Sequence, residues 1–221
     1  AYRPIAAAVG LATEGAAVAS EAAQEQTAAP EAAAAIDALV DAALAQAGLE
    51  ANPTAEPHVI IRRLYFDLTG LPPTPAEMQA FLQDPEPETA YSRLVDRLLM
   101  SPRYGETMAR RWMDVVRYAD SVTLRGFVLP QAWRYRDYLI RAYNEDRPFA
   151  TMIEEQVAGD LLSADDYDQR QQQLIATTFW TLGNTNLEQQ DKTQLEMDFI
   201  DEQLDVLGHA LLGQTIGCAR C

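Results

Sequence analysis

Cysteine, histidine and lysine are scarce in this chain. Its 221 residues include two cysteines, two histidines (His58 and His209) and one lysine, Lys192. A chain of this length can bury a sizeable core, so disulfide bonds are not needed to hold the fold together. A structural zinc site needs about four ligands, and it would use both cysteines and both histidines.

Long hydrophobic runs are also missing. No stretch of about 18 apolar residues occurs, so no segment is expected to span a membrane. The chain begins with Ala1, and the short apolar stretch at 5–12 is a poor match to a signal peptide. We interpret the sequence as a mature or excised portion of a longer protein.

Positive charge is in deficit, with a net charge of -16 that is unevenly distributed. Residues 1–51 hold seven acidic residues against Arg3 alone, and residues 154–221 hold thirteen against three basic ones. Residues 52–153 balance thirteen acidic residues with thirteen arginines. Binding to DNA or RNA requires a net basic face, so a nucleic-acid partner is not expected.

Alanine dominates the start of the chain, where it supplies 22 of the first 51 residues. Residues 1–30 lack repeated large apolar side chains and are predicted to be an Ala-rich linker or arm. From Glu31 the pattern changes, because Ile36, Leu39 and Val40 fall at helical spacing and Gly48 is placed to end a helix. The helical domain is therefore predicted to cover residues 31–221.

The remaining sequence shows helical periodicity throughout. Thr74, Pro75 and Glu77 have the spacing of a capping box at a helix start. Further helices are predicted at 58–68, 90–100, 106–118, 133–143, 152–157, 167–182 and 195–212. No segment shows sustained strand-type alternation. The predicted fold is all-α, an irregular bundle of about eight or nine helices with an Ala-rich N-terminal arm.

The final residues, GCARC, contain a C-x-x-C motif at Cys218 and Cys221. Such a pair can attach haem through two thioethers when a histidine follows directly, and that histidine would lie beyond Cys221. A thioredoxin-like pair would instead follow a strand at a helix start, whereas this motif follows a long predicted helix. A disulfide or two idle thiols is the further alternative.

Acidic residues recur along the predicted last helix. They share one face with a histidine, at Asp198, Asp201, Glu202, Asp205 and His209. Oxygen ligands of this kind suit a hard cation, and metal-assisted hydrolysis would be the matching activity. The favoured interpretation is a solvated acidic face opposite the apolar side chains Phe199, Ile200, Leu204, Leu207 and Leu211.

Two predicted helices in the middle of the chain are rich in arginine and aromatic residues. Arg110 and Arg117 lie at helical spacing from Asp114. Such arginines can clamp an anionic substrate, but pairing with carboxylates between helices is the favoured interpretation. The core is then expected to include Trp112, Tyr118, Trp133 and Tyr138. Because no catalytic triad, P-loop or nucleotide-binding glycine pair is present, no enzyme activity is assigned.

Four blocks together resemble one family. They are RRLYFDLTGLPPTPAEMQAFL at 62–82, LVDRLLMSPRYGETMARRWMDVVRYADS at 94–121, AWRYRDYLIRAYNEDRPFATMIEEQVAGDLL at 132–162 and DFIDEQLDVLGHALLGQTIGCARC at 198–221. These blocks are similar to the second type of planctomycete cytochrome-associated domain, a domain of uncharacterised function found in large secreted bacterial proteins. The similarity covers most of residues 36–221, and AYRPI at the start resembles the junction that follows a cytochrome domain.

The resemblance implies that Cys218 and Cys221 anchor haem c, since relatives continue the motif as C-x-R-C-H. It also implies a periplasmic or extracellular protein whose partner is a redox protein or an adjacent cytochrome domain of the same chain. The leading hypothesis is a domain that contributes to c-type haem attachment and electron transfer. The alternative is a non-catalytic binding or scaffold module for polysaccharide or a cell-surface partner, with the two cysteines joined as a disulfide.

Overall fold

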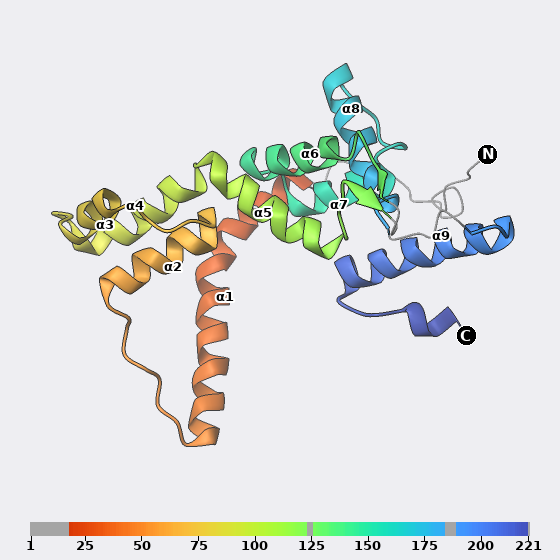
Figure 1. Ribbon diagram of the computed structural model, residues 1–221. Coiled ribbons are helices and arrows are strands. Elements are labelled where there is room, and N and C mark those ends of the chain that lie inside the picture. Colours follow the sequence, from red (N-terminus) through yellow and green to blue (C-terminus); the bar gives the residue numbers. More distant parts are fainter. Residues whose placement is uncertain (1–17, 123–125, 184–188, 221) are drawn as a thin grey trace. The chain divides into compact units, whose positions relative to one another are not determined.

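The computed structural model describes residues 18–122, 126–183 and 189–220 (Figure 1). Within them the chain is all-helical, as predicted. Its nine α-helices are α1 (Val18–Ala47), α2 (Pro57–Thr69), α3 (Pro75–Leu82), α4 (Pro87–Leu99), α5 (Pro102–Val115), α6 (Trp133–Asn144), α7 (Phe149–Ala158), α8 (Tyr167–Ala176) and α9 (Lys192–Leu207).

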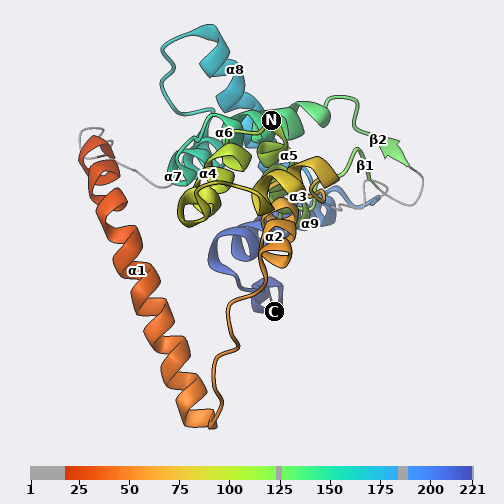
Figure 2. The ribbon, with the colours of Figure 1, turned by 90° about the vertical axis from the view of Figure 1, so that its left-hand side faces the viewer.

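Shorter elements complete the described chain. Figure 2 shows an antiparallel ladder of two-residue strands, β1 (Ser121–Val122) and β2 (Phe127–Val128). Three short turns are the 3-10 helix η2 (Thr177–Trp180), the π-helical turn η3 (Gly208–Leu212) and the 3-10 helix η4 (Gly217–Arg220).

The chain divides into two compact units, Ala1–Glu56 and Pro57–Cys221. In the first, α1 ends where predicted, because Gly48 adopts a φ of +66° that favours glycine. The apolar residues whose spacing predicted this helix are exposed: the exposed fraction is 61% for Ile36, 73% for Leu39 and 52% for Val40. No described helix combines the length and apolar character needed to cross a membrane. The domain boundary expected between residues 30 and 31 stays a prediction.

The second unit contains two hydrophobic clusters. The larger joins α5, α6, α7, η2 and α9, and its most deeply buried large side chains include Tyr135, Leu139, Met152, Phe179 and Val206. The smaller cluster joins α2 and α4 through Ile61, Tyr65, Leu94 and Leu98. The helices α2, α4, α5 and α6 each contribute residues three or four positions apart, which is why their helical periodicity was visible in the sequence.

The predicted capping box starts α3. The Glu77 amide donates to Thr74 Oγ1 at 3.3 Å, and the Thr74 amide donates to Glu77 Oε2 at 2.8 Å. The prediction from this spacing is therefore confirmed.

One predicted helix, 167–182, is divided in the structure. The α-helix ends at Ala176 and η2 follows, because the Thr177 and Thr181 hydroxyls donate to carbonyls three residues earlier. The start of α8 is fixed by Asp166, whose carboxylate accepts from the Gln169 amide at 2.8 Å.

Glycine permits the close approach of α7 and α8. Gly159 is buried at the end of α7, and a Cβ placed on it would lie only 2.2 Å from the Gln173 backbone oxygen. No side chain fits there, so the contact between the two helices requires glycine.

Candidate functional site

One of the two predicted haem-anchoring residues, Cys218, lies near the C-terminal end of the described chain. Cys218 is an exposed residue of η4, and Cys221 lies outside the described residues. The η4 turn packs against α9, where a Cβ on Gly217 would come 3.6 Å from Asp205 Oδ1. Asp205, one of the predicted metal ligands, is therefore next to the residue that precedes Cys218.

Asp205 lies between the side chains of His209 and Arg117. Its Oδ2 atom is 3.3 Å from His209 Nδ1 and 3.8 Å from Arg117 Nη1. Because Nδ1 faces this carboxylate, Nε2 is the ring nitrogen of His209 that is left for another ligand. The imidazole is 41% exposed, so that nitrogen is accessible from solvent.

The other two predicted metal ligands on α9 are Asp201, one turn before Asp205, and Asp198, two turns before it. Asp198 accepts a hydrogen bond from Gln194 Nε2 at 2.6 Å. Among the described residues, no three His, Cys, Asp or Glu side chains form a group that could hold a metal ion. Metal binding by Asp198, Asp201, Asp205 and His209 stays a prediction.

The acidic face of α9 is turned toward the protein, so the prediction that it is solvated was wrong. Its half-buried carboxylates are Asp198, Asp201, Glu202 and Asp205. Ile200 and Leu204, which were expected on the buried side, are 37% and 41% exposed. The orientation of α9 is therefore set by charge pairing as well as by apolar burial, and the pairing partner is Arg117.

Arg117 joins the end of α5 to α9. Its guanidinium forms an ion pair with the Glu202 carboxylate, and Nη2 donates to the Glu202 backbone carbonyl at 2.8 Å. This contact confirms the expectation that arginines of this segment pair with carboxylates between helices, and it identifies Glu202 on α9 as the partner of Arg117. Arg117 itself has a φ of +59°, a conformation that L side chains rarely adopt.

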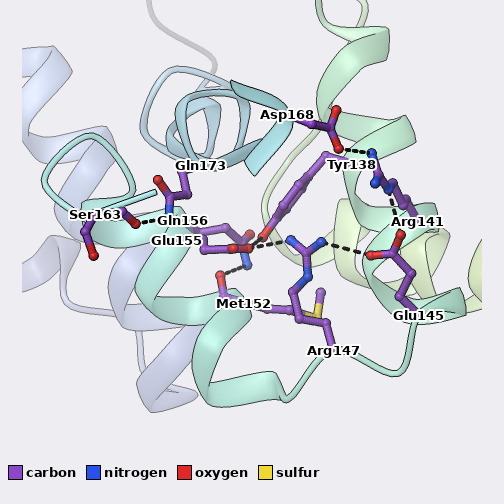
Figure 3. Close-up of polar contacts among 10 residues, drawn as sticks. All are labelled: Tyr138, Arg141, Glu145, Arg147, Met152, Glu155, Gln156, Ser163, Asp168 and Gln173. Atoms are coloured by element: carbon purple, nitrogen blue, oxygen red, sulfur yellow. Dashed lines mark hydrogen bonds and ion pairs between the residues drawn. The ribbon is translucent and has the colours of Figure 1, made fainter. Parts of the chain in front are cut away.

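A second group of polar side chains surrounds Glu155 (Figure 3). Glu155 is 5% exposed, and its Oε2 atom accepts from Tyr138 Oη at 2.7 Å and from Arg147 Nη1 at 2.7 Å. Arg147 and Glu155 therefore form a buried ion pair, and the Tyr138 hydroxyl satisfies a further lone pair of the Glu155 carboxylate. It connects α6, α7 and the loop between them.

The same charge network extends to the surface through alternating acids and arginines. Arg147 Nη2 contacts Glu145 Oε2 at 3.0 Å, Glu145 Oε1 contacts Arg141 Nε at 2.7 Å, and Arg141 Nη1 contacts Asp168 Oδ2 at 2.9 Å (Figure 3). The hydrogen bond from Arg141 is the main cause that lowers the pKa of Glu145. Burial, followed by the hydrogen bond to Glu155, raises the pKa of Tyr138 above its ordinary value.

Gln156 forms the neighbouring buried contact between α5, α6 and α7. Its Oε1 atom accepts from Trp112 Nε1 at 2.8 Å and from the Tyr135 hydroxyl, and its Nε2 donates to the Met152 carbonyl at 2.9 Å. Each polar atom of this amide is thus used inside the core, so Gln156 fixes the register of the three helices.

Sequence reasoning missed Glu155 and Gln156 as central residues. Glu155 lies three positions after the buried Met152 and Gln156 lies four, so helical spacing places them on the core-facing side of α7. That signal was available, but their polar character favoured a surface position. Their partners are all within the protein, so this network explains how the helices are held and supplies no free acid, base or nucleophile.

The expectations for the aromatic residues and for His58 have mixed outcomes. Trp112 and Tyr138 are buried and Tyr118 is half-buried, as predicted, whereas Trp133 is 44% exposed and packs beside Arg134. His58, at the start of α2, is exposed.

Comparison with known proteins identifies the family. The model of the family PSCyt2, described as "Protein of unknown function (DUF1549)", matches residues 35–221. No curated protein and no solved structure matches the chain. The match includes the four blocks that suggested the resemblance, the Glu155 network and the C-terminal edge. The chain therefore belongs to the PSCyt2 family, the planctomycete cytochrome-associated domain of unknown function.

Proposed function

We propose that this chain is an extracytoplasmic domain of a larger cytochrome-like protein and contributes to c-type haem attachment and electron transfer. The observation that carries the proposal is the position of Cys218, exposed in the η4 turn beside Asp205. An exposed thiol in a C-x-x-C motif is accessible for covalent attachment. The family's association with cytochrome-like proteins supports the same assignment.

The chemistry of two cysteines in a C-x-x-C motif supports a haem at this end of the chain. Cys218 and Cys221 would hold the group by adding their S–H bonds across its two vinyl groups, with sulfur on one carbon and hydrogen on the other, so no oxidant is needed. When bound, the haem iron would supply reversible one-electron transfer.

The neighbouring side chains have separate roles in this proposal. Asp205 orients the His209 ring through Nδ1, which leaves Nε2 as a candidate iron ligand. Arg117 and Glu202 hold α9 in place, and therefore hold the helix that carries His209. An adjacent cytochrome domain or a separate redox protein would be the electron partner.

The localisation follows from the same proposal. Thioether attachment of haem takes place outside the cytoplasm, so the protein would be periplasmic or extracellular. The cysteines would then need to be kept reduced until attachment, since a disulfide is the competing product in an oxidising compartment.

The test is haem content of the full-length gene product made in cells that carry the haem maturation machinery. We expect haem staining on a denaturing gel and a Soret band, both lost in the Cys218→Ser, Cys221→Ser double variant. For His209, we expect the Soret position to shift in His209→Gln and to stay unchanged in His58→Gln, the matched control.

Two results would contradict the proposal. A colourless full-length protein made under these conditions would do so, as would peptide mass spectra in which Cys218 is joined to Cys221 without a porphyrin mass. The second result would favour the scaffold alternative.

A further inference from the structure

A cleft of about 380 Å³ lies between α2 and α5. Its lining includes neither Cys218 nor any residue of the Glu155 network. Three arginines line it, Arg103, Arg110 and Arg111, together with a single carboxylate, that of Glu106. In a chain with a net charge of -16, this cleft therefore concentrates positive charge. Such a local excess favours an anionic ligand.

Two of the three guanidinium groups of this cleft, those of Arg103 and Arg110, have no ion-pair partner among the described residues. No described carboxylate forms an ion pair with Arg103 or Arg110, and Arg111 donates to the Asp67 backbone carbonyl at 3.1 Å. By contrast, Arg117, Arg141 and Arg147 all pair with carboxylates. The planar fork of each unpaired guanidinium is free to bind an oxyanion with two parallel hydrogen bonds.

A second cleft, of about 310 Å³, shows the difference. It is lined by Arg141 and Arg147, whose charges are matched by Glu155, Asp166 and Asp168 in the same lining. Because its arginines already pair with Glu155 and Asp168, that cleft has no guanidinium left for a ligand. The α2–α5 cleft, in contrast, has the guanidinium groups of Arg103 and Arg110 left for a ligand.

Two threonines in the lining donate their hydroxyl hydrogens to backbone carbonyls of their own helices. Thr69 Oγ1 donates to the Tyr65 carbonyl at 2.7 Å, and Thr107 Oγ1 donates to the Arg103 carbonyl at 2.9 Å. Since each hydroxyl hydrogen is already used, only the oxygen lone pairs remain for a ligand. Such acceptors suit the hydroxyl groups of a sugar or a polyhydroxy acid.

Apolar groups complete the lining. Phe66 is 38% exposed and Leu71 is 44% exposed, and both contribute to the wall of the cleft. The Arg62 guanidinium lies 4.8 Å from the centroid of the Phe66 ring, which adds positive charge close by. Because Arg62 covers part of the Phe66 ring, the apolar surface left for the C–H groups of a sugar is Leu71 and the uncovered part of Phe66.

We propose that the α2–α5 cleft binds an acidic sugar, with the carboxylate held by Arg103 and Arg110 and hydroxyls donating to Thr69 and Thr107. This inference does not depend on haem attachment. Glu106 opposes the ligand's charge in this arrangement and limits the affinity, so its neutralisation strengthens binding.

The experiment is calorimetric titration of the full chain with D-glucuronate, D-glucose and sulfate at low ionic strength. Saturable binding is expected for glucuronate, with glucose and sulfate each weaker by about tenfold or more. The Arg103→Gln, Arg110→Gln double variant is expected to lose about tenfold or more in glucuronate affinity. The control Arg63→Gln removes an exposed arginine of α2 outside the lining and should change affinity less than about twofold.

Glu106→Gln provides the decisive comparison, because unfolding cannot produce a gain. We expect it to bind glucuronate a few-fold more tightly than the parent chain. The proposal is overturned if glucuronate binds no better than glucose, if sulfate binds as well as glucuronate, or if the double variant keeps the parent affinity.

Discussion

The guanidinium of Arg117 contacts Glu202 at two points, its carboxylate and its backbone carbonyl. The two residues are 85 positions apart, and neither helical spacing nor a motif connects them. Arg117 makes these contacts from a backbone φ of +59°. Its side chain therefore stabilises the fold while its backbone conformation costs free energy, and substitutions can separate the two contributions.

The free energy of unfolding should be highest for the parent chain, lower for Arg117→Gly and lowest for Arg117→Ala. Arg117→Ala loses the contacts to Glu202 and should reduce the free energy of unfolding by about 2 kcal/mol. Arg117→Gly loses the same contacts but adopts positive φ without strain, so it should be about 1 kcal/mol more stable than the alanine variant. Urea denaturation measures both, and an alanine variant as stable as the glycine variant would contradict this account.

Loss of the buried charge at Glu155 should be costly. Glu155→Gln leaves Arg147 without its buried partner and should lower the free energy of unfolding by about 3–5 kcal/mol. Glu145, the other partner of Arg147, has a side chain that is 44% exposed. Glu145→Gln should therefore lower the free energy of unfolding by less than about 1 kcal/mol. Equal costs in chemical denaturation would show that the burial of Glu155 is not what matters.

Stability should fall in alkali because of the buried tyrosines. Burial raises the pKa of Tyr138 above its ordinary value of 10.0, and burial raises that of Tyr118 to about 12. Above pH 10 the unfolded chain releases these protons while the folded chain keeps them, so the free energy of unfolding decreases as pH rises.

Tyr138→Phe should therefore flatten the alkaline decline by about 1.4 kcal/mol per pH unit, the value for one proton. Tyr167→Phe, at a site that is 78% exposed, is the matched control and should leave the slope unchanged. Urea denaturation at several alkaline pH values, with tyrosinate absorbance recorded in parallel, gives the slopes. A parent slope reproduced by Tyr138→Phe would refute the assignment.

The capping box of α3 should contribute stability at neutral pH. The hydrogen bonds from Thr74 lower the pKa of Glu77 from 4.5, so this contribution is present above 4.5 and is lost as the pH falls through the lowered pKa. Thr74→Ala should cost about 1 kcal/mol at neutral pH and less in acid. Thr74→Ser keeps the hydroxyl and should stay close to the parent in thermal melts at both pH values.

Gly159→Ala should be among the most damaging small substitutions. Its Cβ would lie 2.2 Å from the Gln173 backbone oxygen, so α7 and α8 must separate, at a cost of about 3 kcal/mol or more. Gly217→Ala places its Cβ at an ordinary 3.6 Å from Asp205 and should change the free energy of unfolding by less than about 0.5 kcal/mol. Similar melting temperatures for the two variants would contradict the packing argument.

Local signals in the sequence predicted the local structure well. The capping box at Thr74 and the stop at Gly48 depend on neighbouring residues, and both are confirmed. The family was also recognisable, because its motifs are contiguous blocks.

Contacts between distant segments could not be predicted in the same way. The sequence indicated that Arg117 pairs with a carboxylate of another helix, but which carboxylate it contacts depends on how helices meet in space. The half-buried carboxylates of α9 depend on the same geometry, and helical periodicity alone placed them wrongly in solvent. Trp133 shows the same limit, since an aromatic side chain at a helix start can pack against a neighbouring arginine and stay 44% exposed. Measuring the haem content of the full-length gene product tests the role of Cys221 and of a haem.

The long sequence separation between Arg117 and Glu202 has a kinetic consequence. A contact across 85 residues forms only after a large loop has closed, and loop closure is costly early in folding. We therefore expect α9 to dock after the transition state, so that weakening this contact accelerates unfolding and leaves the refolding rate nearly unchanged. The C-terminal cysteine motif would then be the last part of the domain to reach its native environment. Under the haem-attachment proposal, this order would leave its thiols open to a maturation enzyme while the rest of the fold is already formed.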